Sequence, residues 1–252
     1  RPGMFPFFKS SHFGGNSSRE RRKMDLCWQF SFIMRNRLLA LFVLGSRSSN
    51  AFVSPSSSRR FYTSSLAMAK KVLVPIAEGS EEIETTCITD TLTRFGAEVT
   101  IASVMPGELV CKMSRGIKVM ADVNIDEAAK EEWDLIALPG GMPGAEHLRD
   151  SVALIGLLEK QKSQNKPYAA ICAAPAVVLA SKGLLEGEGA TCYPAPGFRE
   201  KLTNPIDDEV AFTAGKVTTS KGPGTALKFA LELGEQLFGK EARDKIQSEM
   251  LV

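Results

Sequence analysis

The sequence predicts an α/β fold in which helices cover both faces of a mostly parallel central sheet. From residue 71 onward, short and continuously apolar runs alternate with segments of helical periodicity. A strand that is buried on both faces gives such an unbroken apolar run, which is typical of a parallel sheet. Several runs end directly in tight or glycine-rich turns. Ligands bind beyond the carboxyl ends of such strands, so these turns predict one shared site.

The elements follow one another in a regular order. Residues 71–77 (KVLVPIA) predict a buried strand, and residues 81–95 predict a helix that ends at Gly96, because apolar residues recur there at helical spacing. Further strands are expected at residues 97–104, 110–111, 117–120, 133–138, 168–172, 190–193 and 216–220. Further helices are expected at residues 151–161, 176–182 and 226–238, together with a short acidic helix that starts at Asn124 or Asp126.

The first 69 residues differ in composition from the rest of the chain. They carry 11 Lys and Arg but only 2 Asp and Glu, whereas residues 70–252 carry 20 basic and 27 acidic residues. A basic start at Met34, an apolar core over residues 38–45 and a Ser- and Arg-rich stretch after it are typical of a two-part targeting presequence. We therefore expect residues 1–69 to be a disordered leader, with the true start at Met34, and residues 70–252 to be one domain.

The composition also limits the compartment and the partners. Residues 49–55 (SNAFVSP) resemble the Ala-Phe junction of precursors imported into secondary plastids, so a plastid is expected, with the mitochondrion or the cytosol as alternatives. The apolar core of the leader is too short to span a bilayer. The acidic balance after residue 70 does not favour nucleic acid. The five cysteines show no metal-binding spacing, so no metal is expected.

Cys172 lies where an apolar strand turns into a predicted helix. Ala173, Ala174 and Pro175 follow it, and proline suits the first turn of a helix because its missing N–H costs nothing there. Free backbone N–H groups at a helix N-terminus would face Cys172 and favour its thiolate, as in a nucleophile elbow. The alternative interpretation is a buried structural cysteine.

Three acidic residues, Glu81, Glu82 and Glu84, open the first predicted helix. Acidic residues at the start of a helix stabilise the helix dipole, and this role alone explains two of the three glutamates. A carboxylic acid that points at Cys172 would instead relay protons, with its pKa raised by burial.

Gly140 and Gly141 follow the strand at 133–138. Their backbone N–H groups, with that of Ala173, would form an oxyanion hole. Glycines serve a tight turn equally well, so the structural alternative stays open.

Other reaction classes lack the residues that they need. His147 is the one histidine after the leader, and a surface position is expected for it. Ala173 follows the cysteine, so an adjacent Cys-His pair is excluded and a papain-like dyad is disfavoured. Residues 220–225 lack the Gly-Lys-Ser/Thr ending of a phosphate loop. Peptidases, amidotransferases and nucleotide-binding proteins are therefore disfavoured.

Five segments in coherent order resemble the DJ-one/PfpI (ThiJ) superfamily, and within it the DJ-one branch. They are Gly79–Glu84, Ser114–Lys118, Leu138–Gly141, Ala169–Pro175 and Thr219–Thr225, and the resemblance covers residues 70–252. It implies a flavodoxin-like sandwich that forms a homodimer and needs no cofactor. Ala173 in place of a histidine argues against the peptidase and heat-shock branches.

The resemblance also implies roles for single residues. Cys172 matches the oxidation-sensitive nucleophile, and Glu84 matches the protonated glutamate that hydrogen-bonds it. Gly141 and Ala173 match backbone donors of the pocket.

Further pocket residues are implied around these. Glu81 and Arg115 match pocket or dimer-edge residues, and Gly140 belongs to the same pocket. Tyr193 stands where other relatives carry a histidine, so the orientation of the substrate is expected to differ.

Two functions fit these residues. The first is a cofactor-free, cysteine-dependent enzyme that detoxifies reactive dicarbonyls in carbonyl and oxidative stress. It would act as a glutathione-independent glyoxalase or as a deglycase of proteins and nucleotides, on a small dicarbonyl or glycated substrate. The second is a redox-sensing stress chaperone in which Cys172 oxidises to a sulfinate.

Overall fold

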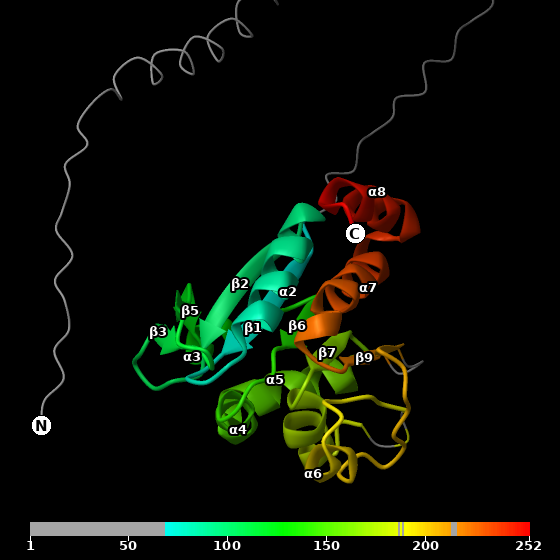
Figure 1. Ribbon diagram of the computed structural model, residues 1–252. Helices are drawn as coiled ribbons and strands as arrows, with labels where there is room; N and C mark the ends of the chain where they lie inside the picture. The colour runs from blue at the N-terminus through cyan, green and yellow to red at the C-terminus, as the bar shows by residue number, and fades with distance from the viewer. Residues whose placement is uncertain (1–68, 186, 188, 213–215) are drawn as a thin grey trace, which may run out of the picture. The chain divides into compact units, whose positions relative to one another are not determined.

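A seven-stranded sheet is the centre of the part of the chain that the computed structural model describes, which is residues 69–185, 187, 189–212 and 216–252 (Figure 1). The strand order is β5-β2-β1-β6-β7-β9-β8, and every neighbouring pair is parallel except β8 and β9. The strands are β1 Lys71–Ile76, β2 Glu98–Ser103, β5 Val123–Asn124, β6 Leu135–Leu138, β7 Tyr168–Ile171, β8 Val210–Phe212 and β9 Val217–Ser220. An antiparallel hairpin lies apart from this sheet, with β3 at Val110–Lys112 and β4 at Lys118–Met120.

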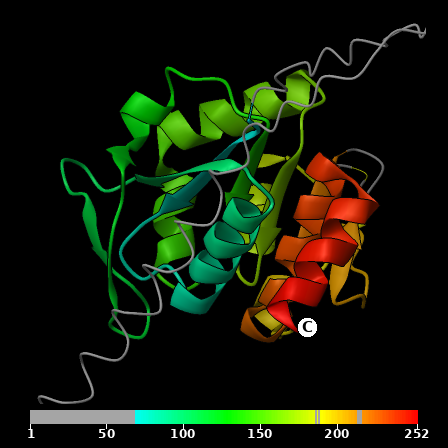
Figure 2. The same ribbon diagram turned by 90° about the horizontal axis from the view of Figure 1, so that it is seen from above.

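Helices cover both faces of the sheet (Figure 2). One face carries α2 (Glu82–Arg94) and α7 (Ala226–Phe238), and α8 (Lys240–Met250) packs on α7. The other face carries α3 (Ile125–Ala128), α4 (Gly144–Asp150) and α5 (Val152–Ser163). The short elements are a π-helical turn at Pro175–Leu179, 3-10 turns at Ala180–Lys182 and Pro223–Thr225, and α6 at Pro196–Arg199. The predicted α/β fold with a mostly parallel sheet is confirmed.

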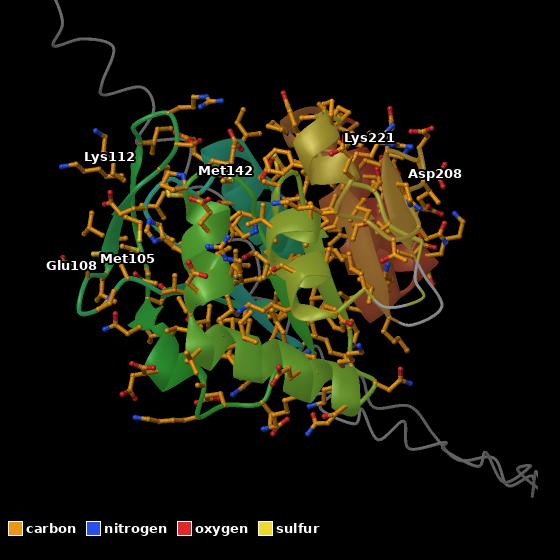
Figure 3. All side chains as sticks on the ribbon, turned by 90° about the horizontal axis from the view of Figure 1, so that it is seen from below. Met105, Glu108, Lys112, Met142, Asp208 and Lys221 are labelled. Atoms are coloured by element: carbon orange, nitrogen blue, oxygen red, sulfur yellow. The ribbon has the colours of Figure 1, made fainter. Side chains whose placement is uncertain are left out.

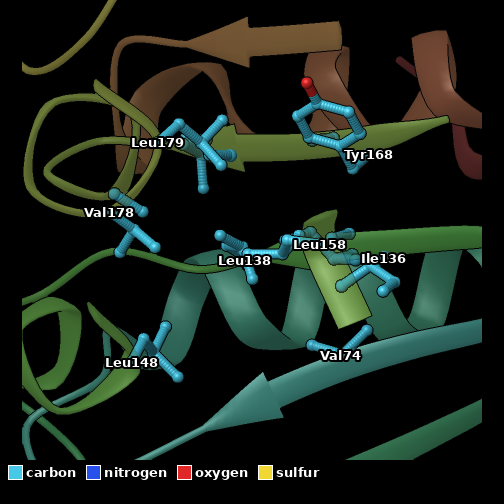
Figure 4. Close-up of a cluster of buried hydrophobic side chains, with 14 of the residues drawn as sticks. Val74, Ile136, Leu138, Leu148, Leu158, Tyr168, Val178 and Leu179 are labelled. Carbon is cyan, nitrogen blue, oxygen red and sulfur yellow. The ribbon is translucent and has the colours of Figure 1, made fainter. Parts of the chain in front are cut away.

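The core between the sheet and the α4–α5 layer consists of aliphatic side chains (Figure 4). Val74 of β1 and Ile136 of β6 are fully buried there, and Leu158 reaches them from α5. Tyr168 is the polar exception, and its hydroxyl donates to the carbonyl of Leu184 at 2.7 Å. Burial of each large aliphatic side chain stabilises the fold by about 1.5–3 kcal/mol, so this layer holds the strand ends in place.

Residues 190–193 do not form the strand that the sequence predicts. Their one bridge to another segment joins Ala190 to Pro205. The N–H of Thr191 donates to the side chain of Thr219 at 2.9 Å, and the N–H of Tyr193 donates to the carbonyl of Cys172 at 2.8 Å. The edge of β9 that faces away from β7 is paired with β8, so no edge of β9 is open to residues 190–193. These residues lie across the end of the sheet instead.

The helix expected at 176–182 is also different in the structure. A π-helical turn and a 3-10 turn replace it, and Gly183 ends them in the left-handed region at φ +67°. Strands β5 and β8 and helix α8 have no counterpart among the expected elements. The leader, residues 1–69, lies outside the described residues except for Ala69. Within the described part of the chain, no helix is long and apolar enough to cross a membrane.

Candidate active site

Three turns at the carboxyl ends of β1, β6 and β7 meet at one place. The N–H of Glu81 donates to the carbonyl of Gly140 at 3.1 Å, which joins the first turn to the second. A Cβ at Gly140 would lie 2.7 Å from the Cβ of Cys172, so the second and third turns are in contact. No side chain fits between backbones this close, which explains the glycine at position 140. The shared site that the sequence predicts at these strand ends is therefore present.

Gly141 is needed for a second reason. Its φ is +84°, which L-residues rarely adopt, and a Cβ there would lie 2.4 Å from the carbonyl oxygen of Gly79. This conformation turns the backbone of the β6–α4 connection toward Cys172.

Cys172 occupies a strained backbone position between β7 and the π-helical turn. Its φ is +64°, although it has a side chain, and its N–H donates to the carbonyl of Ser220 at 2.9 Å. A non-glycine residue in this region costs roughly 1–3 kcal/mol and is typical of functional sites. The side chain is 9% exposed, so the sulfur is close to the surface without being free in water.

Glu84 lies beside the sulfur and is fully buried. Its Oε2 accepts the N–H of Gly140 at 2.7 Å, and its Oε1 has no hydrogen-bond partner among the described residues. The carboxyl group lies close enough to Cys172 for each group to shift the pKa of the other. Both Oε1 and Sγ lie 4.0 Å from the Cβ position of Gly222, which places the two reactive atoms at the same wall of the site.

The two groups compete for a proton. Burial raises the pKa of Glu84 to about 7, although the N–H of Gly140 and the Cys172 side chain lower it. Burial and the nearby charge of Glu84 raise the pKa of the Cys172 thiol to about 12. The backbone N–H groups of Gly141 and Ala173 do lower the pKa of the thiol, but burial and the Glu84 charge outweigh them, so the expected net preference for the thiolate is wrong. A π-helical turn, rather than an α-helix, directly follows Cys172.

The two shifts leave Glu84 as the more acidic group of the pair. A thiol with a carboxylate and a thiolate with a carboxylic acid hold the same number of protons, so one proton transfer interconverts them. A carboxyl group with a pKa near 7 is well matched to proton transfer at neutral pH.

Two backbone N–H groups lie close to the sulfur. Those of Gly141 and Ala173 lower the pKa of the Cys172 thiol. Gly140 does not join them, because its N–H is bound to Glu84. The expected three-donor oxyanion hole is thus wrong for Gly140, which orients the base from behind the pocket.

A pocket of about 220 Å³ opens in front of Cys172. Four of the expected residues line it beside the cysteine and Ala173: Glu81, Arg115, Gly141 and Tyr193. The sequence analysis did not single out Ser114, Met142, Phe198 and Pro223, which complete the lining. Figure 3 shows Met142 at the surface, between Lys112 and Lys221 in that view, and its side chain is 42% exposed. A larger hollow of about 740 Å³ beside Lys70 lies at the amino ends of β1, β6 and β7 among charged side chains.

Glu82 has a function that the helix-dipole interpretation missed. Its carboxylate accepts the hydroxyl of Ser114 at 2.9 Å and the N–H of Arg115 at 2.8 Å, so it fixes the β3–β4 hairpin at the pocket. Burial would raise the pKa of Glu82, but its own backbone N–H and these two donors hold it below the ordinary value. Glu81 caps α2 by accepting the N–H of Glu84 at 2.8 Å.

His147 lies on α4 and does not line the pocket. The thiols of Cys87, Cys111 and Cys192 are likewise absent from its lining, and all three are free. In the part of the chain that the structure describes, no group of acidic, His and Cys side chains is arranged to hold a metal ion.

The comparisons with known proteins agree on one family. The model of the DJ-1/PfpI family matches residues 70–236. The crystal structure of oxidized DJ-1 from Toxoplasma gondii is similar, with 49% identity and a TM-score of 0.70 over 73% of this chain and 98% of that chain. A glutathione-independent glyoxalase of Caenorhabditis elegans, DJR-1.2, is 33% identical over 72% of this chain and 96% of that protein.

Two plant relatives are longer than this chain. Protein DJ-1 homolog B of Arabidopsis thaliana is 45% identical over 184 residues, and homolog A is 42% identical over 190 residues. These matches cover 72% and 74% of this chain but 41% and 47% of the two plant proteins. The chain thus spans less than half the length of these curated relatives.

Proposed function

This chain belongs to the DJ-1/PfpI family, and we propose that it is a cofactor-free enzyme that converts reactive α-oxoaldehydes to hydroxy acids without glutathione. One observation carries the proposal, the buried pair of Cys172 and Glu84 in front of two backbone N–H donors. A relative that is named a glutathione-independent glyoxalase supports the same chemistry.

The first step joins the substrate to the enzyme. The Cys172 sulfur adds to the aldehyde carbon of methylglyoxal, and its proton passes to the Glu84 carboxylate. The aldehyde oxygen becomes an alkoxide that accepts the N–H groups of Gly141 and Ala173. Glu84 then protonates this oxygen, which gives a hemithioacetal and returns Glu84 to the carboxylate form.

The second step moves hydrogen between the two carbonyl carbons. Glu84 removes the proton from the former aldehyde carbon, and the electron pair forms an enediolate with its negative charge on the former ketone oxygen. The hydroxyl proton of the former aldehyde oxygen passes to that oxygen, and Glu84 delivers its own proton to the neighbouring carbon. The former aldehyde carbon is oxidised to a thioester while the ketone carbon is reduced to an alcohol, so no external oxidant is needed. Water hydrolyses the thioester, releases lactate and restores the thiol. Glyoxal gives glycolate by the same steps.

Loss of methylglyoxal in the absence of glutathione, with detection of lactate, tests this function. Wild type and Cys172→Ser are compared, after titration has established that the wild-type thiol is reduced. We expect lactate from the wild type and none from the variant. Absence of lactate from both proteins would refute the enzyme and favour the alternative, in which oxidation of Cys172 controls a chaperone.

The reversal of early glycation adducts would be an extension of the same chemistry. It is separated from glyoxalase activity by supplying a purified glycated peptide while free dicarbonyl is trapped in solution. Release of the unmodified peptide faster with enzyme and trap than with the trap alone supports a deglycase. Equal release rates with and without enzyme, when the trap is present, support a glyoxalase alone.

We further propose that the enzyme is a homodimer. Ile83 on α2 is 53% exposed and Ile117 on the β3–β4 hairpin is 58% exposed. Glu82 binds the hairpin to the start of α2, so the two exposed isoleucines lie on neighbouring elements. Sedimentation tests this: Ile117→Asp is expected to give monomers, whereas Val152→Asp, at an exposed site on α5, remains dimeric. A monomeric wild type would contradict the proposal.

We also propose import into a plastid, on the composition of residues 1–69. Mass spectrometry of the mature N-terminus tests the presequence. A mature protein that starts upstream of Met34 would refute it.

A further inference from the structure

Part of the pocket lining is apolar and aromatic, beside the polar side chains of Glu81, Ser114 and Arg115, and the proposed reaction does not use this part. Tyr193 and Phe198 form an edge-to-face pair, with ring centroids 6.4 Å apart and an interplanar angle of 83°. Met142 and Pro223 continue this lining. Tyr193 is 44% exposed, although a ring of this size favours burial. An exposed apolar surface that borders a reactive group is typical of a ligand-binding wall.

The wall begins next to the reacting atoms. Cδ2 of Tyr193 lies 3.4 Å from the Cβ position of Gly222, and the Cys172 sulfur lies 4.0 Å from the same point. The N–H of Tyr193 donates to the carbonyl of Cys172 at 2.8 Å, which fixes the ring relative to the nucleophile. A group attached to a carbonyl carbon bound at Cys172 would therefore meet the Tyr193 ring directly.

The geometry also orients the substrate. Its reacting oxygen is held by the N–H groups of Gly141 and Ala173, so its substituent points away from them, toward the mouth of the pocket. A methyl group is too small to cover the wall formed by Tyr193 and Phe198. A planar ring covers it and gains the stacking or edge contacts that aromatic pairs prefer.

We infer that the site selects α-oxoaldehydes that carry an aromatic ring, with Tyr193 and Phe198 as the specificity-determining residues. This inference rests on the proposed function and adds the substrate class. The probe pair is phenylglyoxal and methylglyoxal, which share the reacting group and differ in the substituent.

The first experiment compares kcat/KM for the two probes in the full chain and in variants. The readout is kcat/KM for phenylglyoxal divided by kcat/KM for methylglyoxal. Comparing this ratio between proteins cancels the intrinsic reactivity of the two probes. Tyr193→Ala is expected to lower the ratio by on the order of tenfold, and Phe198→Ala by about threefold. Tyr193→Phe keeps the ring and is expected to keep the ratio. An unchanged ratio in Tyr193→Ala overturns the inference.

A second readout does not depend on turnover. Alkylation of Cys172 by N-phenylmaleimide and by N-ethylmaleimide is followed by peptide mass spectrometry, which separates this thiol from the other cysteines. The ratio of the two rates is expected to fall in Tyr193→Ala by a factor similar to that for the dicarbonyls. Val152→Ala, on the surface of α5, is the control and keeps the wild-type ratio.

The two readouts separate the two proposals. No lactate or mandelate, together with a phenyl preference in alkylation that depends on Tyr193, refutes the proposed function and supports the aromatic wall. Turnover that depends on Cys172 while both ratios stay unchanged in Tyr193→Ala refutes the wall and leaves the proposed function standing.

Discussion

Replacing Glu84 by glutamine changes how the stability of the fold depends on pH. The pKa of Glu84 is about 7 in the fold, mainly because of burial, against an ordinary value of 4.5. A group whose pKa is raised by folding stabilises the fold fully below its unfolded pKa, and this contribution is lost as the pH rises through the folded pKa. One pKa unit corresponds to about 1.4 kcal/mol. From pH 4 to pH 8 the free energy of unfolding of the wild type is therefore expected to fall by about 3 kcal/mol relative to that of Glu84→Gln.

Urea unfolding of both proteins at pH 4, 6 and 8 gives the required difference in the free energy of unfolding. The comparison cancels the titration of all other groups that the two proteins share. Glutamine keeps the size of the side chain and an acceptor for the N–H of Gly140, so no cavity complicates the result. Parallel curves for the two proteins from pH 4 to pH 8 would show that the pKa of Glu84 is not raised in the fold.

Glu82→Gln is the matched control, two residues away on the same helix. Hydrogen bonds from its own backbone, Ser114 and Arg115 hold the pKa of Glu82 below 4.5 despite burial. A lowered pKa contributes stability above the unfolded pKa that is lost as the pH falls through the folded pKa. As the pH rises from 3 to 5, the free energy of unfolding of the wild type is therefore expected to increase relative to that of Glu82→Gln. This trend is opposite to the one expected for Glu84→Gln.

Three further predictions follow from the site and the core. Gly141→Ala places a Cβ 2.4 Å from the carbonyl oxygen of Gly79, at a residue whose φ is +84°. We expect the free energy of unfolding, measured by urea titration, to fall by at least about 2 kcal/mol. Wild-type stability of this variant would contradict the close contact. Phe229→Ala removes a fully buried ring of α7 and is expected to cost about 3–5 kcal/mol by the same measurement, whereas a loss under about 1 kcal/mol would contradict this packing. Finally, kcat/KM for methylglyoxal is expected to rise through about pH 7 as Glu84 loses its proton, and a flat profile from pH 5 to pH 9 would exclude Glu84 as the base.

The sequence was sufficient for the central strands and for the helix that follows the first of them. Strands β1, β6 and β7 are continuous apolar runs, and a strand that is buried on both faces leaves this signal in the sequence itself. Helix α2 begins at an acidic cap and ends before Gly96, so the sequence also predicted where this helix begins and ends.

Elements that depend on distant partners were harder to predict. The run at 190–193 has strand-forming residues, but β8 takes the place on β9 where it would pair. Helix α8 is polar on most of its surface, and Gly239 separates it from α7. Its few apolar residues do not predict a helix from the sequence alone, and the structure shows that it packs on α7. The segment after Cys172 is fully buried and forms a π-helical turn, which residue preferences for an α-helix do not describe.

The site shows the same division. The sequence indicated Cys172 and Glu84, because a cysteine at a strand-to-helix turn and an acid at the start of a helix both lie at the carboxyl ends of strands. It did not separate Gly140 from Gly141, since which N–H is already bound depends on the position of the Glu84 carboxylate. It also gave the wrong direction for the pKa of Cys172, because burial is a property of the assembled core.

We propose that Glu84 serves as the base for the Cys172 thiol. The most direct test is the pH dependence of Cys172 alkylation by iodoacetamide, measured by peptide mass spectrometry in the wild type and in Glu84→Gln. The wild-type rate is expected to rise through about pH 7, where Glu84 loses its proton. In Glu84→Gln the rise is expected above pH 9, because burial still raises the pKa of the thiol and no base remains beside it. A rise near pH 7 in both proteins would contradict the account.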